Sequence, residues 1–313
     1  MRKLLAGVDL GATNLRVALS DGKKLLVERK EKTLLVDPFS PSRQILSLLR
    51  SMLFKGGSLE GVGLASVGPL DLKRGEVRNS PNLPFKRVPL VKPLEEELEV
   101  PVILLNDCSA AVVGEREFGA GRGVDDLVYV GIGTGIGGGA YVDGHLLWGK
   151  EGNAVEIGHL VVDSSGRLEC GCGRRGHWEA YCSGTGLPKL VDWRLKRGEG
   201  KGSMLRKRWK DGLKAEDFFE AVRAGDSFAL KVLEEVGRLN GIGFTSLVEA
   251  YDPSLITVGG TVALKNAKWL LPPVRRWMRR EAYNRPPTVR LTPLGERAGL
   301  YGAVGIIRQE VRK

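Results

Sequence analysis

The sequence predicts an α/β protein made of two related α/β domains with a cleft between them. Strand-like and helix-like patterns alternate along the chain, as expected for sheets covered by helices. The order strand, glycine-rich turn, strand opens the chain at residues 3–21 and returns at residues 126–149. No low-complexity tract or obvious linker separates the halves, so the 313 residues should form one or two compact domains.

The first half begins with two strands around a tight turn, and Asp21-Gly22 is the hairpin signal that leads into a third strand over 24–33. Apolar residues at helical spacing then predict a helix over 41–54. The remaining elements of this half are, in order, a strand over 61–68 that ends at Pro69, a helix over 91–98, a strand over 101–107 and a helix over 108–117.

The second half repeats the opening arrangement, with Asp143-Gly144 as its hairpin turn. A stripe of apolar residues from Phe228 to Leu247 predicts a long helix over 226–249. The chain then continues with a strand over 255–260, a basic helix over 272–285, a strand over 288–294 and a final helix over 298–311.

The composition, 42% hydrophobic and 27% charged, is that of an ordinary globular protein. The apolar runs have the length of strands, well short of the roughly 20 residues that span a bilayer. The first run is interrupted by Asp9 and has no cleavage site, which indicates a buried strand rather than a signal peptide. We therefore expect a cytoplasmic protein with no membrane partner, in which clustered cysteines bind metal rather than form disulfides.

The net charge of +11 comes from two segments. Residues 194–214 hold nine basic against two acidic residues, and residues 272–285 hold five against one. Trp209 and Trp277 lie among them, an arrangement that a nucleic-acid surface would also show. A solvated helical face with aromatic anchors is the simpler interpretation, so we expect no nucleic-acid partner.

Two glycine-rich turns follow predicted strands and are candidates for phosphate binding. Glycine permits a tight turn whose backbone N–H groups converge on an anion. In the first turn Thr13 adds a hydroxyl and Asp9 could hold water around a phosphate-bound Mg²⁺, although a plain hairpin has the same pattern. The second turn, Gly131 to Gly139, has six glycines in nine residues, and the strand after it distinguishes it from Walker and Rossmann loops. A nucleotide clamped between the two domains would use both turns.

Asn106 and Asp107 end a predicted strand directly before a helix. A carboxylate there can cap the helix, and that role alone would explain Asp107. Strand ends of α/β proteins also project side chains into the ligand cleft. Asp107 could then accept a proton from a substrate hydroxyl that attacks a γ-phosphoryl group.

The chain has only four cysteines and three histidines, and most of them gather in one region. The clustered residues are His159, Cys170, Cys172, His177 and Cys182. Zinc binds such side chains, although an ordinary loop with two buried thiols is the alternative. Glu156 and Glu179 flank the cluster and supply the acceptors that hold uncharged, polyhydroxylated ligands.

Together these segments resemble the ROK family of sugar kinases and repressors, within the actin-like ATPase superfamily, over essentially the whole chain. The matching segments are DLGATN at 9–14 and GTGIGGG at 133–139 (phosphate motifs), PNLP at 81–84 (sugar-contacting turn), NDCSAAVVGE at 106–115 (catalytic segment), EIGH at 156–159 with CGCGRRGHWE at 170–179 (signature), and LITVGG at 255–260 (adenosine motif). Each is modest evidence, but their order and combination are highly specific.

The resemblance implies a two-lobed actin-like ATPase fold, which is ribonuclease H-like. Residues 1–108 and the C-terminal helix, 298–313, would form a small lobe, and residues 109–297 a large lobe with a zinc loop. The family holds a structural Zn²⁺ with one His and three Cys, and matching gives His159, Cys170 and Cys172. His177 stands where the third Cys should be, and zinc accepts a Cys₂His₂ set. Cys182 is the alternative fourth ligand.

The resemblance further implies an ATP-dependent hexose kinase, most simply a glucokinase of possible broad range, with Asp107 as the base that accepts the proton of the sugar 6-hydroxyl. The substrate-binding residues would be Asn82, Asn106, Asp107, Glu156, His159 and Glu179. The residues that bind ATP and its Mg²⁺ would be Asp9, Gly11, Ala12, Thr13, Asn14, Gly133, Thr134, Gly135, Gly137, Gly138, Gly259 and Gly260.

A sugar-sensing ROK transcriptional repressor is the alternative from another class. Such repressors carry an N-terminal helix-turn-helix domain, whereas this chain starts on the first phosphate-motif strand, so we expect a kinase. The intact Asp107 also favours catalysis. Among kinases, fructokinase and N-acetylmannosamine kinase share most sugar contacts and stay open, and we expect a homodimer.

Overall fold

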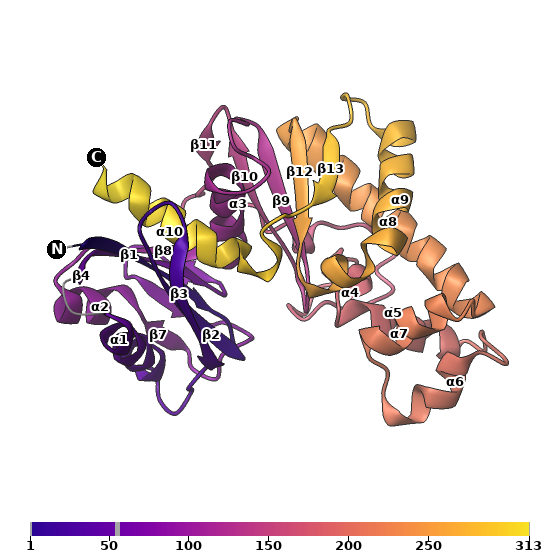
Figure 1. Ribbon diagram of the computed structural model, residues 1–313. Coiled ribbons are helices and arrows are strands. Elements are labelled where there is room, and N and C mark those ends of the chain that lie inside the picture. Colours follow the sequence, from indigo (N-terminus) through magenta and orange to yellow (C-terminus); the bar gives the residue numbers. More distant parts are fainter. Residues whose placement is uncertain (1, 54–56, 313) are drawn as a thin grey trace. The chain divides into compact units, whose positions relative to one another are not determined.

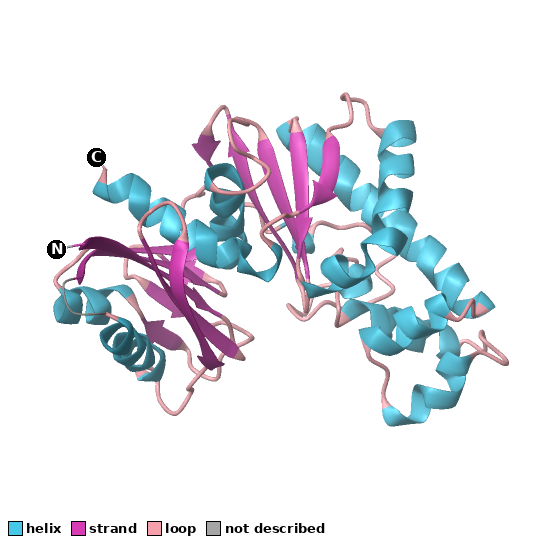
Figure 2. Cartoon of the chain, in the orientation of Figure 1, coloured by secondary structure: helices cyan, strands magenta, loops and turns pink. Residues whose placement is uncertain are grey.

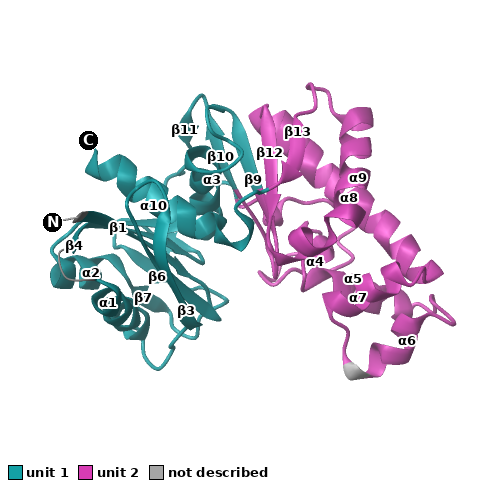
Figure 3. Cartoon of the chain, viewed as in Figure 1, with its two compact units in different colours: residues 1–129, 139–155, 292–313 teal, residues 130–138, 156–291 magenta. Residues whose placement is uncertain are grey.

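The computed structural model describes residues 2–53 and 57–312, which form two compact units (Figures 1 and 3). Unit 1 contains residues 1–129, 139–155 and 292–313, and unit 2 contains residues 130–138 and 156–291. These units are defined by internal packing and do not coincide with the predicted lobes, because the helix after residue 107 packs within unit 1. The lobe division at residue 108 stays a prediction about which segments move together.

Unit 1 is built on a five-stranded sheet in the order β3-β2-β1-β4-β8. Its strands are β1 (Arg2–Leu10), β2 (Asn14–Ser20), β3 (Leu25–Lys32), β4 (Gly57–Ser66) and β8 (Val102–Asn106). The first three form antiparallel hairpins, and β4 and β8 run parallel to β1. The predicted strands of this half are therefore confirmed, and the carboxyl ends of β1, β4 and β8 lie at the same edge.

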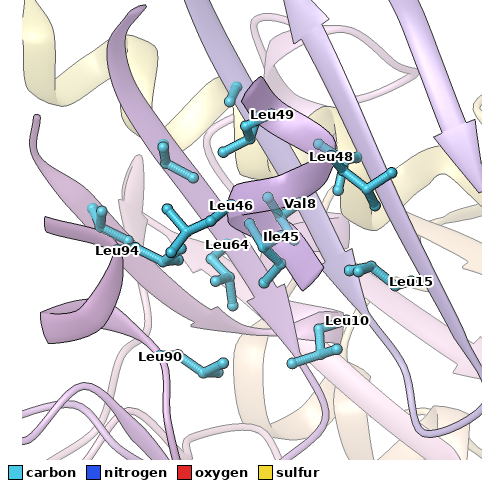
Figure 4. Packing of buried hydrophobic residues seen from close by; sticks show 14 of the residues in the cluster. Val8, Leu10, Leu15, Ile45, Leu46, Leu48, Leu49, Leu64, Leu90 and Leu94 are labelled. Atoms are coloured by element: carbon cyan, nitrogen blue, oxygen red, sulfur yellow. The ribbon is translucent and has the colours of Figure 1, made fainter. Parts of the chain in front are cut away.

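The core of unit 1 lies between this sheet and helices α1 (Ser40–Met52) and α2 (Val91–Leu98) (Figure 4). Alternate residues of a strand face opposite sides of a sheet, so Val62 and Leu64 of β4 meet the apolar face of α1. The helix predicted over 41–54 is confirmed through Met52, and residue 54 lies outside the described part of the chain.

The opposite face of the sheet is covered by α10 (Ala298–Val311), which also packs on α3 (Asp107–Glu117) (Figure 2). A Cβ at Gly63 would lie 1.7 Å from the carbonyl oxygen of Ala303, and a Cβ at Gly302 would lie 1.6 Å from that of Ala110. Only glycine permits these close approaches. They bring the first turns of α3 and α10 to the strand edge that carries Asp9 and Asp107.

A three-stranded sheet, β5-β6-β7, completes unit 1 and is absent from the predicted elements. Its strands are β5 (Leu70–Asp71), β6 (Glu76–Arg78) and β7 (Arg87–Pro89). The β6–β7 loop carries the PNLP turn. Arg87 donates two hydrogen bonds from Nε and one from Nη2 to the buried Glu76 carboxylate, which joins the base of this loop.

The second large sheet has the order β11-β10-β9-β12-β13. Its strands are β9 (Leu127–Ile132), β10 (Ile136–Val142), β11 (His145–Leu146), β12 (Leu255–Gly259) and β13 (Thr288–Leu291). The β9–β10 hairpin repeats the β1–β2 hairpin, so the predicted duplication is confirmed. The boundary between the units passes through β9 and β10.

Unit 2 contains most of the remaining helices. They are α4 (Glu179–Cys182), α5 (Gly186–Lys196), α6 (Met204–Arg208), α7 (Ala215–Arg223), α8 (Ser227–Tyr251) and α9 (Thr261–Glu281). The predicted long helix corresponds to α8, which Asp226 caps by accepting hydrogen bonds from the N–H groups of Phe228 and Ala229. The basic helix was predicted to start at Pro272, but α9 begins at Thr261 and includes a non-helical residue, Asn266.

Three of the nine basic side chains of residues 194–214, those of Arg194, Lys196 and Arg208, form ion pairs with acidic residues. Arg194 pairs with Glu199 and Glu235, and Arg208 pairs with Glu220 at 2.7 Å. The indole of Trp209 donates a hydrogen bond to Asp192. In the other basic segment, the ring of Trp277 packs where a Cβ of Gly241 would lie, so it anchors α9 on α8. Both tryptophans therefore have packing roles. Within the described residues, no helix has the length and apolarity needed to cross a bilayer.

These ion pairs predict that the basic segments do not read DNA sequence. Titration with duplex DNA at about 0.15 M salt, followed by fluorescence anisotropy, should show no sequence-selective binding in the sub-micromolar range, where specific DNA-binding proteins operate. Weak, salt-sensitive binding that is equal for unrelated duplexes would reflect net charge alone. Tight and selective binding would support the repressor function instead.

Candidate active site

The predicted site residues fall into two groups, one in each unit. In unit 1 the group consists of the first glycine turn with Asp9, the PNLP turn with Asn82, and Asn106 with Asp107. In unit 2 it consists of the second glycine turn, Glu156, His159, the cysteine cluster, Glu179 and Gly259-Gly260.

Asp9 lies at the carboxyl end of β1, just before the turn from Gly11 to Thr13. The turn is closed by a hydrogen bond from the Gly11 N–H to the Asn14 carbonyl at 2.9 Å. The pKa of Asp9 is raised to about 6, mainly by burial and also by the negative charge of Asp107, while the cation of Arg16 opposes this shift. Two carboxylates that repel each other in a partly buried place suit a divalent cation.

Asp9 gives the free energy of unfolding a defined pH dependence. In the unfolded chain its pKa returns to about 3.8, so the cost of the ionised carboxylate to stability grows from about pH 4 upward and is complete above pH 6. Asp9→Asn should therefore be more stable than the wild type at pH 8, by up to about 3 kcal/mol, and only slightly more stable at pH 4. Urea unfolding at both pH values, without Mg²⁺ or nucleotide, measures this. An equal difference at both pH values would contradict the assignment.

Asn106, rather than Asp107, caps helix α3. Its Oδ1 accepts hydrogen bonds from the N–H groups of Cys108 at 2.9 Å and Ser109 at 3.4 Å. Asp107 is the first residue of the helix, and its Oδ1 accepts a hydrogen bond from the N–H of Cys108 at 2.7 Å. Burial raises the pKa of Asp107, which makes its carboxylate a stronger base. The capping role considered for Asp107 is thus filled by its neighbour.

The segment after β4 lies beside Asn106 and was not among the predicted site residues. Ser66 pairs with Asn106 across β4 and β8, and a Cβ at Gly68 would lie 3.3 Å from Nδ2 of Asn106. The amide nitrogen of Asn106 therefore faces the backbone of Gly68, while its oxygen serves the helix cap. Asn82 lies exposed in the β6–β7 loop, where its N–H donates to Oγ of Ser80 at 3.3 Å.

In unit 2 the turn between β9 and β10 is Gly133-Thr134-Gly135, closed by a hydrogen bond from the Gly133 N–H to the Gly135 carbonyl at 2.9 Å. Gly260 links β12 to α9 with a positive φ of 83°, and a Cβ there would lie 2.4 Å from the Ile132 carbonyl oxygen. The segment LITVGG therefore lies directly against the strand end that leads into the second glycine turn. Thr261, which was not among the predicted site residues, also borders this turn: its backbone nitrogen lies 3.8 Å from where a Cβ of Gly133 would be.

Glu179 connects the cysteine cluster to this same turn. Its Oε2 accepts a hydrogen bond from the N–H of Ile136 at 2.9 Å, and its Oε1 lies 3.7 Å from Sγ of Cys170. A Cβ at Gly135 would lie 2.3 Å from Oε2, so a larger residue at that position would displace the Glu179 carboxylate. Glu179, predicted to bind sugar, thus also fixes the start of β10.

The EIGH segment forms a short 3₁₀ turn, Ile157–His159, that packs on β10: a Cβ at Gly158 would lie 2.1 Å from the Ile136 carbonyl oxygen. His159 is part-exposed and lies between two environments. Its Nδ1 faces the cysteine cluster, and its Nε2 lies 3.9 Å from Oε2 of Glu156. One ring nitrogen is therefore directed to the cluster while the other lies beside a carboxylate.

Four side chains form a compact group with one donor atom each, all within 4.8 Å of one another: His159, Cys170, Cys172 and His177. Nδ1 of His159 lies 3.2 Å from Nδ1 of His177 and 3.8 Å from Sγ of Cys170, and Nδ1 of His177 lies 3.3 Å from Sγ of Cys172. Tetrahedral zinc with bonds of about 2.0–2.3 Å requires ligand separations of roughly 3.3–3.8 Å. The donor set and its spacing therefore fit a closed zinc site.

Cys182, the alternative fourth ligand, lies apart from this group. It is fully buried at the end of α4, and its Sγ contacts the carbonyl oxygen of Val236 at 3.8 Å. Burial raises the pKa of its thiol. Burial also lowers the pKa of His177, which keeps that imidazole in the neutral form that metals bind.

Comparison with known proteins agrees with this arrangement. A model of the ROK family matches residues 5–310. The glucokinase of Pyrobaculum calidifontis is 39% identical over 261 residues, which cover 83% of this chain and 80% of that protein. The crystal structure of a ROK hexokinase from Thermus thermophilus is 31% identical, with a TM-score of 0.81 and 99% of each chain covered.

A ROK family glucokinase from Streptomyces griseus, solved in complex with glucose and AMPPNP, is 33% identical with a TM-score of 0.76, covering 98% of this chain and 99% of that one. These likenesses confirm the predicted α/β, two-lobed actin-like ATPase fold. Because the family match extends over nearly every residue, the chain belongs to the ROK family.

Proposed function

We propose that the chain is a glucokinase that transfers the γ-phosphoryl group of ATP to the 6-hydroxyl of glucose. The activity is supported by glucokinases that are 33–39% identical over most of the chain. The proposal rests mainly on the position and the raised pKa of Asp107. It follows a parallel strand at the carboxyl edge of the sheet, its capping function is taken by Asn106, and burial raises its pKa.

Asp107 is the general base of the proposed reaction. Its carboxylate accepts the proton of the sugar 6-hydroxyl as that oxygen attacks the γ-phosphorus. The new O–P bond forms as the bond from the γ-phosphorus to the β,γ-bridging oxygen breaks, and ADP leaves with that oxygen. Asn106 orients Asp107 by fixing the first turn of α3 and offers its amide N–H₂ to the sugar, together with Asn82.

The N–H groups of the two glycine turns neutralise the charge that spreads over the transferring phosphoryl group. Mg²⁺, when bound with ATP, would add a positive charge between the phosphates, and Asp9 is the carboxylate suited to hold its water ligands. Gly259 and Gly260 are proposed to lie beside the adenosine, next to the second turn.

Glu156, His159 and Glu179 are proposed to hold sugar hydroxyls. The cluster of His159, Cys170, Cys172 and His177 would hold Zn²⁺, which fixes the angle and tautomer of the His159 ring. With Nδ1 held at the cluster, Nε2 would carry the proton and would donate to a sugar hydroxyl. The metal has no step in phosphoryl transfer under this proposal.

Three further features of the proposal concern the whole protein. We infer a cytoplasmic enzyme that acts as a homodimer. The predicted small lobe, residues 1–108 with 298–313, closes toward the large lobe when sugar binds. Closure would exclude water, because an open site would hydrolyse ATP.

A coupled assay of ADP release tests the function. It should compare glucose, mannose, fructose, glucosamine and N-acetylated hexosamines at equal concentration with ATP and Mg²⁺. Glucose should give the highest kcat/KM. A preference for fructose or N-acetylmannosamine would assign the chain to another activity among the sugar kinases. If no sugar is phosphorylated, a sugar-sensing repressor becomes the better hypothesis.

A further inference from the structure

Two threonines outside the recognised motifs, Thr33 and Thr185, each donate hydrogen bonds from the N–H and from Oγ1 to carbonyl groups of one of the two glycine turns. We propose that each is a positioning residue that holds carbonyl groups of its turn away from the phosphates, so that the neighbouring N–H groups point toward them. This inference rests on the proposed function, because it concerns how the same two turns bind ATP.

Thr33 follows β3 and contacts the first turn twice. Its N–H donates a hydrogen bond to the Thr13 carbonyl at 3.1 Å, and its Oγ1 donates to the Gly11 carbonyl at 2.7 Å. The two outer carbonyl groups of the turn Gly11-Ala12-Thr13 are therefore both directed at one residue.

Thr185 follows α4 and contacts the second turn. Its N–H and its Oγ1 both donate to the Thr134 carbonyl, at 3.2 Å and 3.1 Å, and the N–H of Gly184 donates to the Gly133 carbonyl at 2.8 Å. The carbonyl groups of two successive peptide units thus point to the segment of residues 183–185.

The side chain of Thr185 does not have the role that is usual at its position in the chain. It stands at the N-cap of α5, where a threonine hydroxyl usually accepts a hydrogen bond from the first turn of its own helix. The Thr185 side chain makes no such cap bond. Oγ of Ser183 accepts from the Gly186 N–H at 2.9 Å instead. The Thr185 hydroxyl lies 3.1 Å from the Thr134 carbonyl oxygen of the second turn and 3.2 Å from Oγ of Ser183.

The direction of each carbonyl group in a turn fixes the direction of the next N–H group. In a planar trans peptide, the C=O of one residue and the N–H of the next point in opposite directions. The N–H of Ala12 therefore points away from Thr33, and those of Thr134 and Gly135 point away from residues 183–185. A turn binds an anion only when its N–H groups, and not its carbonyl oxygens, face that anion. One threonine in each unit imposes this orientation.

Valine and serine substitutions separate the hydroxyl from the shape of the side chain. Thr33→Val and Thr185→Val each remove one hydrogen bond donor, and each should raise the Kd of ATP, measured by calorimetry, roughly 5- to 10-fold. The Kd of adenosine and that of glucose should change less than about twofold, because neither ligand uses the phosphate turns. Thr33→Ser and Thr185→Ser keep the donor and should restore ATP binding. Thr288→Val, at an exposed position on β13, is the matched control.

Unchanged ATP affinity in both valine variants would overturn the inference. So would equal losses for ATP and adenosine, or a lowered Tm without rescue by serine, because these indicate a general structural role. The wild type separates the two proposals: if it phosphorylates glucose while the valine variants bind ATP normally, only the positioning role fails. If the wild type neither binds ATP nor phosphorylates a hexose, both proposals fail.

Discussion

Asp107→Asn is expected to lose at least roughly 10²-fold in kcat, because it removes the proton acceptor and leaves the shape of the side chain unchanged. The affinity for glucose, measured by calorimetry, should stay close to that of the wild type, since the asparagine still offers hydrogen bonds to the sugar. Stability should be equal or higher, because burial already disfavours the ionised form of this carboxyl. The loss would then be one of chemistry and not of folding.

Asp143→Asn is the matched control for this substitution. Asp143 is exposed in the β10–β11 turn at a φ of 49°, a conformation that asparagine also tolerates. It should retain full kcat. If Asp107→Asn itself turned over glucose within a few-fold of the wild type, Asp107 would not be the base.

Sequence motifs were sufficient to predict those parts of the candidate site that lie within a single short segment of the chain. The turn after Asp9 and the Asn106-Asp107 pair could be placed because a strand, a turn or a helix start follows within a few residues. The helix cap shows the limit of such reasoning. Both side chains of that pair can cap a helix, and only the backbone φ and ψ of Asn106 showed which one does.

Segments that contact the site from elsewhere in the chain were not predictable in this way. Gly68 reaches Asn106 only because β4 pairs with β8, and Thr185 reaches the second turn only because α4 returns the chain to it. The signal for Thr185 was present as a glycine-rich stretch, SGTG at 183–186, directly after the cluster. Without the tertiary fold nothing tied that stretch to a phosphate turn.

Two misjudged elements have a physical explanation. The strands of the three-stranded sheet are two or three residues long, too short to show an alternating pattern. Helix α9 was placed too late because only its basic part, residues 272–285, was recognised from the charge pattern. In the structure Pro272 and Pro273 lie inside α9, and the non-helical residue Asn266 lies one to two turns before them.

The spacing of the cysteine cluster left its fourth member open, and the geometry now favours His177. The two candidates are only five residues apart, but His177 precedes α4 while Cys182 ends it. The single helical turn between them carries Cys182 into the core, where its Sγ contacts the Val236 carbonyl. A spacing argument cannot separate two residues that a short helix directs to different places.

His177→Ala should lower the zinc content of the purified protein from about one ion per chain, measured by elemental analysis, since a tetrahedral site that loses one ligand binds metal much more weakly. Tm should fall with the zinc content, and the Kd of glucose should rise because His159 is no longer held at its Nδ1. Cys182→Ala should lower Tm modestly through a small cavity and keep the zinc. His145→Ala, an exposed histidine in β11, should change neither. Zinc lost from Cys182→Ala and kept in His177→Ala would transfer the fourth position to Cys182, and full glucose affinity in zinc-free protein would separate the cluster from the sugar site.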